Sequence, residues 1–310
     1  MKRTVINAIS VSNSVSDRLN GAVLQGVVLH HHTRTCTLAL KPEANPEALS
    51  PIVVTLADAS VEDGPLNILL DAFNLIRERN IAAGASVIYK EDRLELPGVI
   101  VSIAGAARWN PAPDWQKARA ATGYALDLRT EILRQANSRV SHATLLDFLS
   151  PSRPSAGAAE TDALTMRFTS VFQQLRQISA TSLKDTLAAG ADKLAGLGGG
   201  LTPAGDDFLC GVMMAVWFSH DDAAKLCKPP AEIMAQRTTT LSAALLREAA
   251  MGHCSMSWRR FIASLILRDR ALIESAVTGV LSHGATSGAD SLAGFLWMLE
   301  RMEPVSRVSS

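Results

Sequence analysis

The sequence predicts an α+β protein, with a β-rich domain over residues 1–110 and a mainly helical domain over residues 111–310. In the first part, runs of Val, Leu, Ile and Thr are separated by clusters of Pro, Gly, Asn and Asp, as is typical of short strands and turns. In the second part, apolar residues recur at helical spacing. The segment WNPAPDW (109–115) breaks both patterns with two prolines and marks the change.

The β signals of the first domain are GAVLQGVVLHHHTRTCTLALK (21–41), PIVVTLA (51–57), GASVIYK (84–90) and DRLELPGVIVSIAG (92–105). They predict a small sheet or barrel with one or two helical insertions. Residues 65–80 fit a strand as well as a short helix, because Leu69, Phe73 and Ile76 would share one helical face.

The helical domain opens with a periodic segment over residues 114–136. A linker-like stretch, SPSRPSAGAAE (150–160), follows it. Further helices are expected near 161–195, 205–219, 230–251, 257–267, 269–282 and 289–301, before a frayed tail.

Composition argues against several classes of function. With 30 basic and 30 acidic residues, the formal net charge is zero, and only 5% of residues are aromatic. Neither value favours binding to nucleic acid or to an anionic membrane. The apolar run from Phe208 to Phe218 is too short to span a bilayer. The four cysteines have no close CxxC spacing, which fits free thiols in the cytoplasm.

One pattern occurs twice. GDDFLCG (205–211) and GADSLAG (288–294) share Gly, Asp, Leu and Gly at the same spacing. A glycine-threonine element precedes each copy, and an apolar helix with a tryptophan follows. Residues that commonly begin and end helices explain either copy alone, but the duplication favours a shared functional site.

Each copy is expected at a helix N-terminus. Thr202 would be an N-cap with Pro203 in the first helical position, and Thr286 or Ser287 would cap the second helix. The spacing from Ser287 to Asp290 is that of a capping box. The free N–H groups of both first turns would hold a phosphate or carboxylate at 200–202 and 286–288, without help from a lysine or arginine.

Glycine inside a helix costs about 1 kcal/mol relative to alanine. The glycines of the repeated pattern should therefore be compensated by close contact with another helix or with a ligand.

The segments GLTPAGDDFLCG (200–211) and SHGATSGADSLAGF (282–295) resemble the two signature segments of the AllH-type subunit of bacterial oxamate carbamoyltransferase. TTTLSAALLREAAMGH (238–253) is a third, weaker resemblance. Together they cover most of the helical domain. Serine at 282 departs from the family's glycine. Other residues occur in the family at the position of Gly205, so the resemblance assigns Gly205 no catalytic role.

The resemblance implies a transferase subunit of purine (allantoin) catabolism. The reaction converts oxalurate and phosphate into oxamate and carbamoyl phosphate, and other subunits take part. The residues that would serve it as catalytic groups are Asp206, Asp207 and Asp290. Those that would bind the small anionic substrate are Gly200, Leu201, Thr202, Thr239, Ser242, Gly284, Thr286, Ser287 and Gly288.

Three roles stay open for the aspartates. They could orient the NH₂ groups of oxamate and carbamoyl substrates, hold Mg²⁺ through their oxygens, or act as a general base. Two other functions also remain open: a metal-dependent hydrolase of the helical, paired-aspartate type, and a non-catalytic ligand-binding or assembly subunit.

Overall fold

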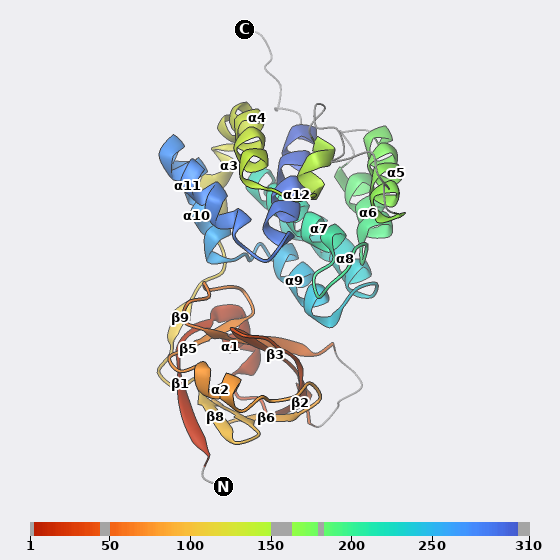
Figure 1. Ribbon diagram of the computed structural model, residues 1–310. Helices are drawn as coiled ribbons and strands as arrows, with labels where there is room; N and C mark the ends of the chain where they lie inside the picture. Colours follow the sequence, from red (N-terminus) through yellow and green to blue (C-terminus); the bar gives the residue numbers. More distant parts are fainter. Residues whose placement is uncertain (1–2, 44–49, 150–162, 179–182, 303–310) are drawn as a thin grey trace. The chain divides into compact units, whose positions relative to one another are not determined.

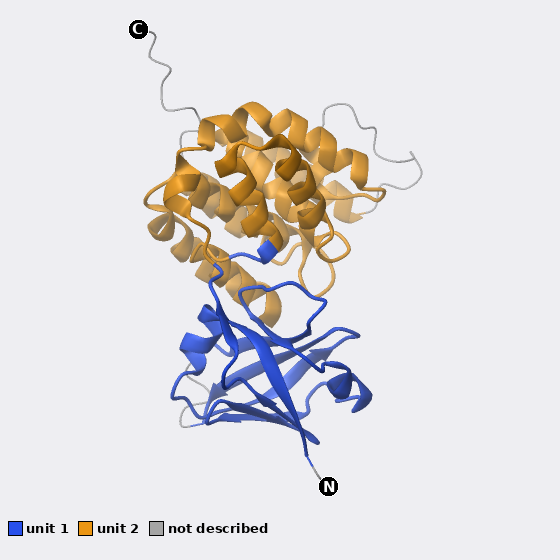
Figure 2. Ribbon diagram, turned by 90° about the vertical axis from the view of Figure 1, so that its left-hand side faces the viewer, with its two compact units in different colours: residues 1–111, 254–256 blue, residues 112–253, 257–310 orange. Residues whose placement is uncertain are grey.

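A computed structural model describes residues 3–43, 50–149, 163–178 and 183–302. It divides into two compact units, shown in Figure 2: Met1–Pro111 with Cys254–Met256, and Ala112–His253 with Ser257–Ser310. The first unit is a β-sheet structure and the second is helical, which confirms the predicted α+β class. The predicted linker at 150–160 and the predicted tail lie outside the described residues.

The first unit is a barrel, whose labelled strands can be followed in Figure 1. Its strands follow the order β5-β4-β3-β2-β6-β7-β8-β1-β9, and an antiparallel pairing of β1 with β5 closes the ring. Strand β1 pairs in parallel with β8 and then, further along, with β9. The strands are β1 (Thr4–Ser12), β2 (Leu24–His31), β3 (Thr35–Pro42), β4 (Ile52–Asp58), β5 (Asn67–Leu70), β6 (Ser86–Lys90), β7 (Arg93–Leu96), β8 (Val99–Ser102) and β9 (Ala107–Trp109).

The barrel interior follows from the two-residue period of its strands. In β6, Val87 and Tyr89 are buried, whereas Ser86, Ile88 and Lys90 point outward. Two short helices, α1 (Asn13–Leu19) and α2 (Asn74–Glu78), accompany the strands, as expected. The ambiguous segment 65–80 contains both a strand, β5, and helix α2.

The helical unit contains α3 (Trp115–Arg119), α4 (Thr122–Arg139), the 3₁₀ helix η1 (Leu145–Leu149), α5 (Ala163–Gln177), α6 (Leu183–Leu194), α7 (Ala204–Ser219), α8 (Ala223–Ala235), α9 (Thr240–Ala250), α10 (Met256–Leu267), α11 (Arg270–Leu281) and α12 (Ser287–Arg301). No helix in the described part of the chain is long and apolar enough to cross a membrane.

Two predicted helices were wrong as single elements. The prediction for 161–195 corresponds to α5 and α6, and that for 230–251 to the end of α8 and to α9. The second break occurs because Thr239 caps a new helix: its hydroxyl accepts a hydrogen bond from the Ser242 N–H at 3.1 Å.

Candidate functional site

Helices α7 and α12, which carry the repeated pattern, lie side by side in the middle of the helical unit (Figure 1). A Cβ atom on Gly211 would lie 1.8 Å from the carbonyl oxygen of Ser291. One on Gly294 would lie 1.9 Å from that of Phe208. The contact is reciprocal, because Phe208 and Ser291 occupy matching places in the two copies. Close helix packing therefore explains these two glycines, as the sequence predicted.

The first glycine of each copy has the same kind of neighbour. A Cβ on Gly205 would lie 2.1 Å from the carbonyl oxygen of Leu194, and one on Gly288 would lie 1.9 Å from that of Val280. Leu194 ends α6 and Val280 lies in the last turn of α11. Each first turn is thus pressed against the end of the preceding helix, and the repeated pattern is a repeated packing unit.

The N-cap of α7 differs from the prediction, whereas the N-cap of α12 is Thr286, one of the two predicted residues. Pro203, rather than Thr202, is the N-cap of α7, and neither it nor Thr286, the N-cap of α12, makes a side-chain capping bond. The hydroxyl of Thr202 lies instead 3.0 Å from the hydroxyl of Ser287. The two signature segments therefore meet through their side chains.

The expectation of free first-turn N–H groups was partly wrong. The Gly205 N–H donates to the carbonyl of Leu197 at 2.8 Å, and the Gly288 N–H donates to that of His283 at 2.9 Å. These groups are already satisfied by the preceding loops, so they are not available to an anion. Gly200 and Gly284 lie in those loops with φ of +84° and +65°, where glycine is favoured.

Asp206 is fully buried, and both of its carboxylate oxygens are bonded within the protein. One accepts the Gly196 N–H at 2.8 Å, and the other accepts the hydroxyls of Thr238 and of Ser242, the latter at 2.8 Å. Thr239 adds a further hydrogen bond, which its hydroxyl donates to the carbonyl of Leu201. This network joins the glycine loop before α7 to the start of α9, and it includes the predicted residues Thr239 and Ser242.

Asp207 points to the other side of the helix start, toward α12. The hydroxyls of Ser287 and Thr202 hydrogen-bond to its carboxyl group. Its Oδ2 atom is buried and has no hydrogen-bond partner among the described residues. Burial, opposed by these hydroxyls and reinforced by the nearby Asp290, raises the pKa of Asp207 to about 8.

Asp290 is also buried, and it does not form the predicted capping box. Its Oδ1 atom accepts the N–H of Leu145, at the start of η1, at 2.8 Å. Burial raises the pKa of Asp290 to about 6, against the lowering effect of bonds from Leu145 and Thr286. The two carboxyl groups thus lie close enough to influence each other across the α7–α12 contact.

The structure adds residues that the sequence analysis missed. One of them is Leu145, whose N–H bonds to Asp290. Another is Thr144, whose hydroxyl is buried and has no hydrogen-bond partner among the described residues. The Thr144 N–H donates to Asp147 at 3.1 Å, and His142 bonds to the carbonyl of Ala285 at 3.0 Å. The spacing of Thr144 and Asp147 is a capping signal for η1, but it does not reveal that η1 faces α12.

The described residues contain no group of three His, Cys, Asp or Glu side chains arranged to hold a metal ion. At this site, both carboxylate oxygens of Asp206 already accept hydrogen bonds, from the Gly196 N–H and from the hydroxyls of Thr238 and Ser242. The predicted triad of Asp206, Asp207 and Asp290 is therefore divided between two hydrogen-bonding environments.

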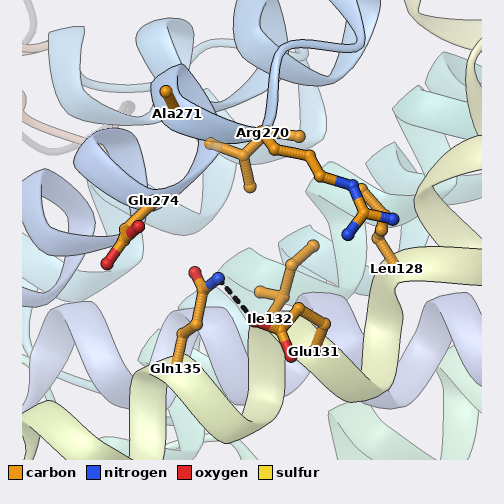
Figure 3. Close-up of a pocket in the computed structure, with 8 residues that line it drawn as sticks. Leu128, Glu131, Ile132, Gln135, Arg270, Ala271 and Glu274 are labelled. Atoms are coloured by element: carbon orange, nitrogen blue, oxygen red, sulfur yellow. Dashed lines mark hydrogen bonds between the residues drawn. The ribbon is translucent and has the colours of Figure 1, made fainter.

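A cavity of about 350 Å³ lies elsewhere in the helical unit, between α4 and α11. Figure 3 shows Arg270, Glu274 and Gln135 around it, with Gln135 bonded to Glu131 at 2.8 Å. None of the residues predicted for the site lines this cavity.

The family model of oxamate carbamoyltransferase subunit AllH matches residues 194–299. This range contains both signature segments and every candidate site residue named from the sequence, and it confirms the predicted resemblance. No solved structure matches the chain.

Proposed function

We propose that this chain is a subunit of an oxamate carbamoyltransferase, the family whose model matches residues 194–299, and that its substrate binds between the starts of α7 and α12. A subunit of such an enzyme has partner subunits. The substrates of the proposal are oxamate with carbamoyl phosphate or, in reverse, oxalurate with phosphate. Its setting is cytoplasmic allantoin catabolism, which agrees with four cysteines that form no disulfide bond among the described residues.

One observation carries the proposal. The duplicated segments converge on a polar cluster in which the hydroxyls of Thr202 and Ser287 are 3.0 Å apart. Beside them lies the buried Oδ2 atom of Asp207, for which the described part of the chain supplies no hydrogen-bond partner. A buried polar atom that the protein leaves unsatisfied is costly, and a ligand that bonds to it removes the cost. Asp207 therefore supports a binding role that Asp206 does not.

The chemistry of carbamoyl transfer gives Asp290 a role. The oxamate nitrogen forms a bond to the carbamoyl carbon, the bond from that carbon to the phosphate oxygen breaks, and phosphate leaves with the electron pair. The nitrogen must lose a proton. A carboxylate whose pKa is raised to about 6 is a suitable base near neutral pH, so Asp290 is the proposed acceptor.

The other predicted residues have supporting roles in this proposal. Asp206, Thr239 and Ser242 fix the loop that contains Gly200 and Leu201. Thr286 bonds to Asp290, while Gly284 and Gly288 shape the start of α12. Neither the metal-dependent hydrolase nor magnesium is part of the proposal.

The test is oxalurate phosphorolysis by the assembled partner subunits, measured with and without this chain. We expect activity to depend on the chain, and Asp290→Asn to lower kcat by about 100-fold while the complex still assembles. The control is Asp222→Asn, which changes an exposed carboxylate paired with Lys225.

A complex that works equally well without the chain would refute the proposal. Full activity of both Asp290→Asn and Asp207→Ala in a complex that needs the chain would instead establish the assembly role.

A further inference from the structure

The starts of α7 and α12 present two carboxyl groups with different surroundings. Asp290 accepts a backbone N–H from Leu145 and a hydroxyl hydrogen bond from Thr286. Asp207 receives only hydroxyl groups, from Ser287 and Thr202, and its Oδ2 atom has no partner in the part of the chain that the structure describes. The backbone N–H and the hydroxyl favour the charged form of Asp290.

Two buried carboxyl groups that act on each other do not both ionise easily. Burial raises the pKa of Asp207 to about 8, above the value of about 6 for Asp290. Because Asp290 accepts the backbone N–H of Leu145 and Asp207 receives hydroxyl groups alone, the proton of the pair lies on Asp207 and the negative charge on Asp290. Because the hydroxyls hold one oxygen of Asp207, the proton is free for donation on the unpartnered Oδ2.

The groups around this pair do not alter that assignment. Asp206 acts on Asp207 from the same helix, and the thiol of Cys210 lies nearby. His142 and Asp147 act on Asp290 with opposite signs. The stretches 194–212 and 284–299 contain no lysine or arginine, and on the α9 side Arg237 pairs with Asp192.

We propose that Asp207 and Asp290 form a binding site for a primary amide, in which the Asp207 O–H donates to the amide carbonyl and the Asp290 carboxylate accepts an amide N–H. One donor beside one acceptor complements the C=O and NH₂ of a carbamoyl or oxamate amide group. The identity of that amide rests on the proposed function, but the donor and acceptor pattern does not.

This pattern also predicts what the site rejects. Oxalate has the shape of oxamate with an oxygen anion in place of NH₂, so it cannot donate to Asp290. It would place a negative charge beside the Asp290 carboxylate instead. The site is therefore specific for the amide end of the substrate and leaves the anionic end to other groups.

The experiment measures the melting temperature of the full chain with oxamate, with oxalate and with acetamide at pH 7. We expect oxamate to raise the melting temperature and oxalate to leave it unchanged. Asp290→Asn should weaken oxamate binding by about tenfold or more, since its acceptor is replaced by a group that can also donate.

Asp207 is tested with a matched pair of variants. Asp207→Asn retains an N–H donor in nearly the same shape, so it should still respond to oxamate, whereas Asp207→Ala should not. Above pH 9 the unchanged protein should lose its response as Asp207 ionises, and Asp207→Asn should keep it.

Equal responses to oxalate and oxamate would overturn the amide site, and so would no response to any of the three compounds. Loss of the response in Asp207→Asn to the extent seen in Asp207→Ala would do the same. A response to acetamide alone, with this variant pattern, would retain the amide site and refute the proposed substrate.

Discussion

On one side of the start of α7, Asp206 bonds to the glycine loop and to α9. On the other side Asp207 faces α12, and one of its oxygens has no hydrogen-bond partner within the described ranges of the chain. Both carboxyl groups are buried, and they are adjacent in the sequence. Burial alone therefore does not distinguish a structural carboxylate from a binding group. The difference lies in whether the fold supplies a partner for each oxygen atom.

The largest effect on stability is expected from Asp206→Ala. The change leaves the Gly196 N–H and the hydroxyls of Thr238 and Ser242 without their acceptor in a buried place. Losses of this kind cost about 3 kcal/mol or more in the free energy of unfolding. Urea denaturation measures this loss of unfolding free energy. The control is Asp192→Ala, because Asp192 is exposed and forms its ion pair with Arg237 at the surface. Equal small losses for both variants would show that the Asp206 network is not structural.

Gly294→Ala tests the close contact between α7 and α12. The new methyl group would overlap the carbonyl of Phe208, so we expect α7 and α12 to separate slightly, at a cost of about 2 kcal/mol. Gly123→Ala in α4 is the matched control, because a Cβ there meets no atom within 4 Å and helix propensity should improve. Two equally mild variants would argue against close α7–α12 packing in solution.

Thr202→Val should have the smallest effect on stability, about 1 kcal/mol or less, because it removes one hydroxyl contact with Ser287. Its effect on the oxamate-dependent rise in melting temperature should be larger, since Thr202 also bonds to Asp207. Thr278→Val, which removes an exposed hydroxyl bonded to Glu274, serves as the control. An unchanged oxamate response in Thr202→Val would place Thr202 outside the site.

The sequence predicted the class of fold, a small sheet or barrel in the first domain, and most helix positions, because strand and helix periodicity are local signals. It did not predict the β1–β5 pairing that closes the barrel. The starts of α7 and α12 were predicted to within one or two residues. The proximity of the two segments followed from their repeated spacing, which the reciprocal contacts of Gly211 and Gly294 explain.

The roles of the individual side chains could not be predicted in the same way. The partners of Asp206 are at 196, 238 and 242, and Asp290 bonds to Leu145, far away along the chain. Local capping rules assigned Thr202 and Asp290 to their own helices. The fold instead uses both for contacts between elements, because α7, α12 and η1 meet at this point.

The pH dependence of stability, compared between the unchanged protein and Asp207→Asn, tests most directly whether Asp207 carries a proton. Between pH 3.8 and about 8 the folded protein retains a proton on Asp207 that the unfolded chain has lost. The contribution of Asp207 to stability therefore falls as the pH rises through this window and levels off above it. Asp290 is present in both proteins, so its titration largely cancels in the difference.

We expect the free energy of unfolding of Asp207→Asn to increase relative to that of the unchanged protein from pH 5 to pH 8, and then to stay level. A difference that is constant over this range would mean that Asp207 ionises as it does in the unfolded chain. That result would contradict the distinction between Asp206 and Asp207 on which the proposed site depends.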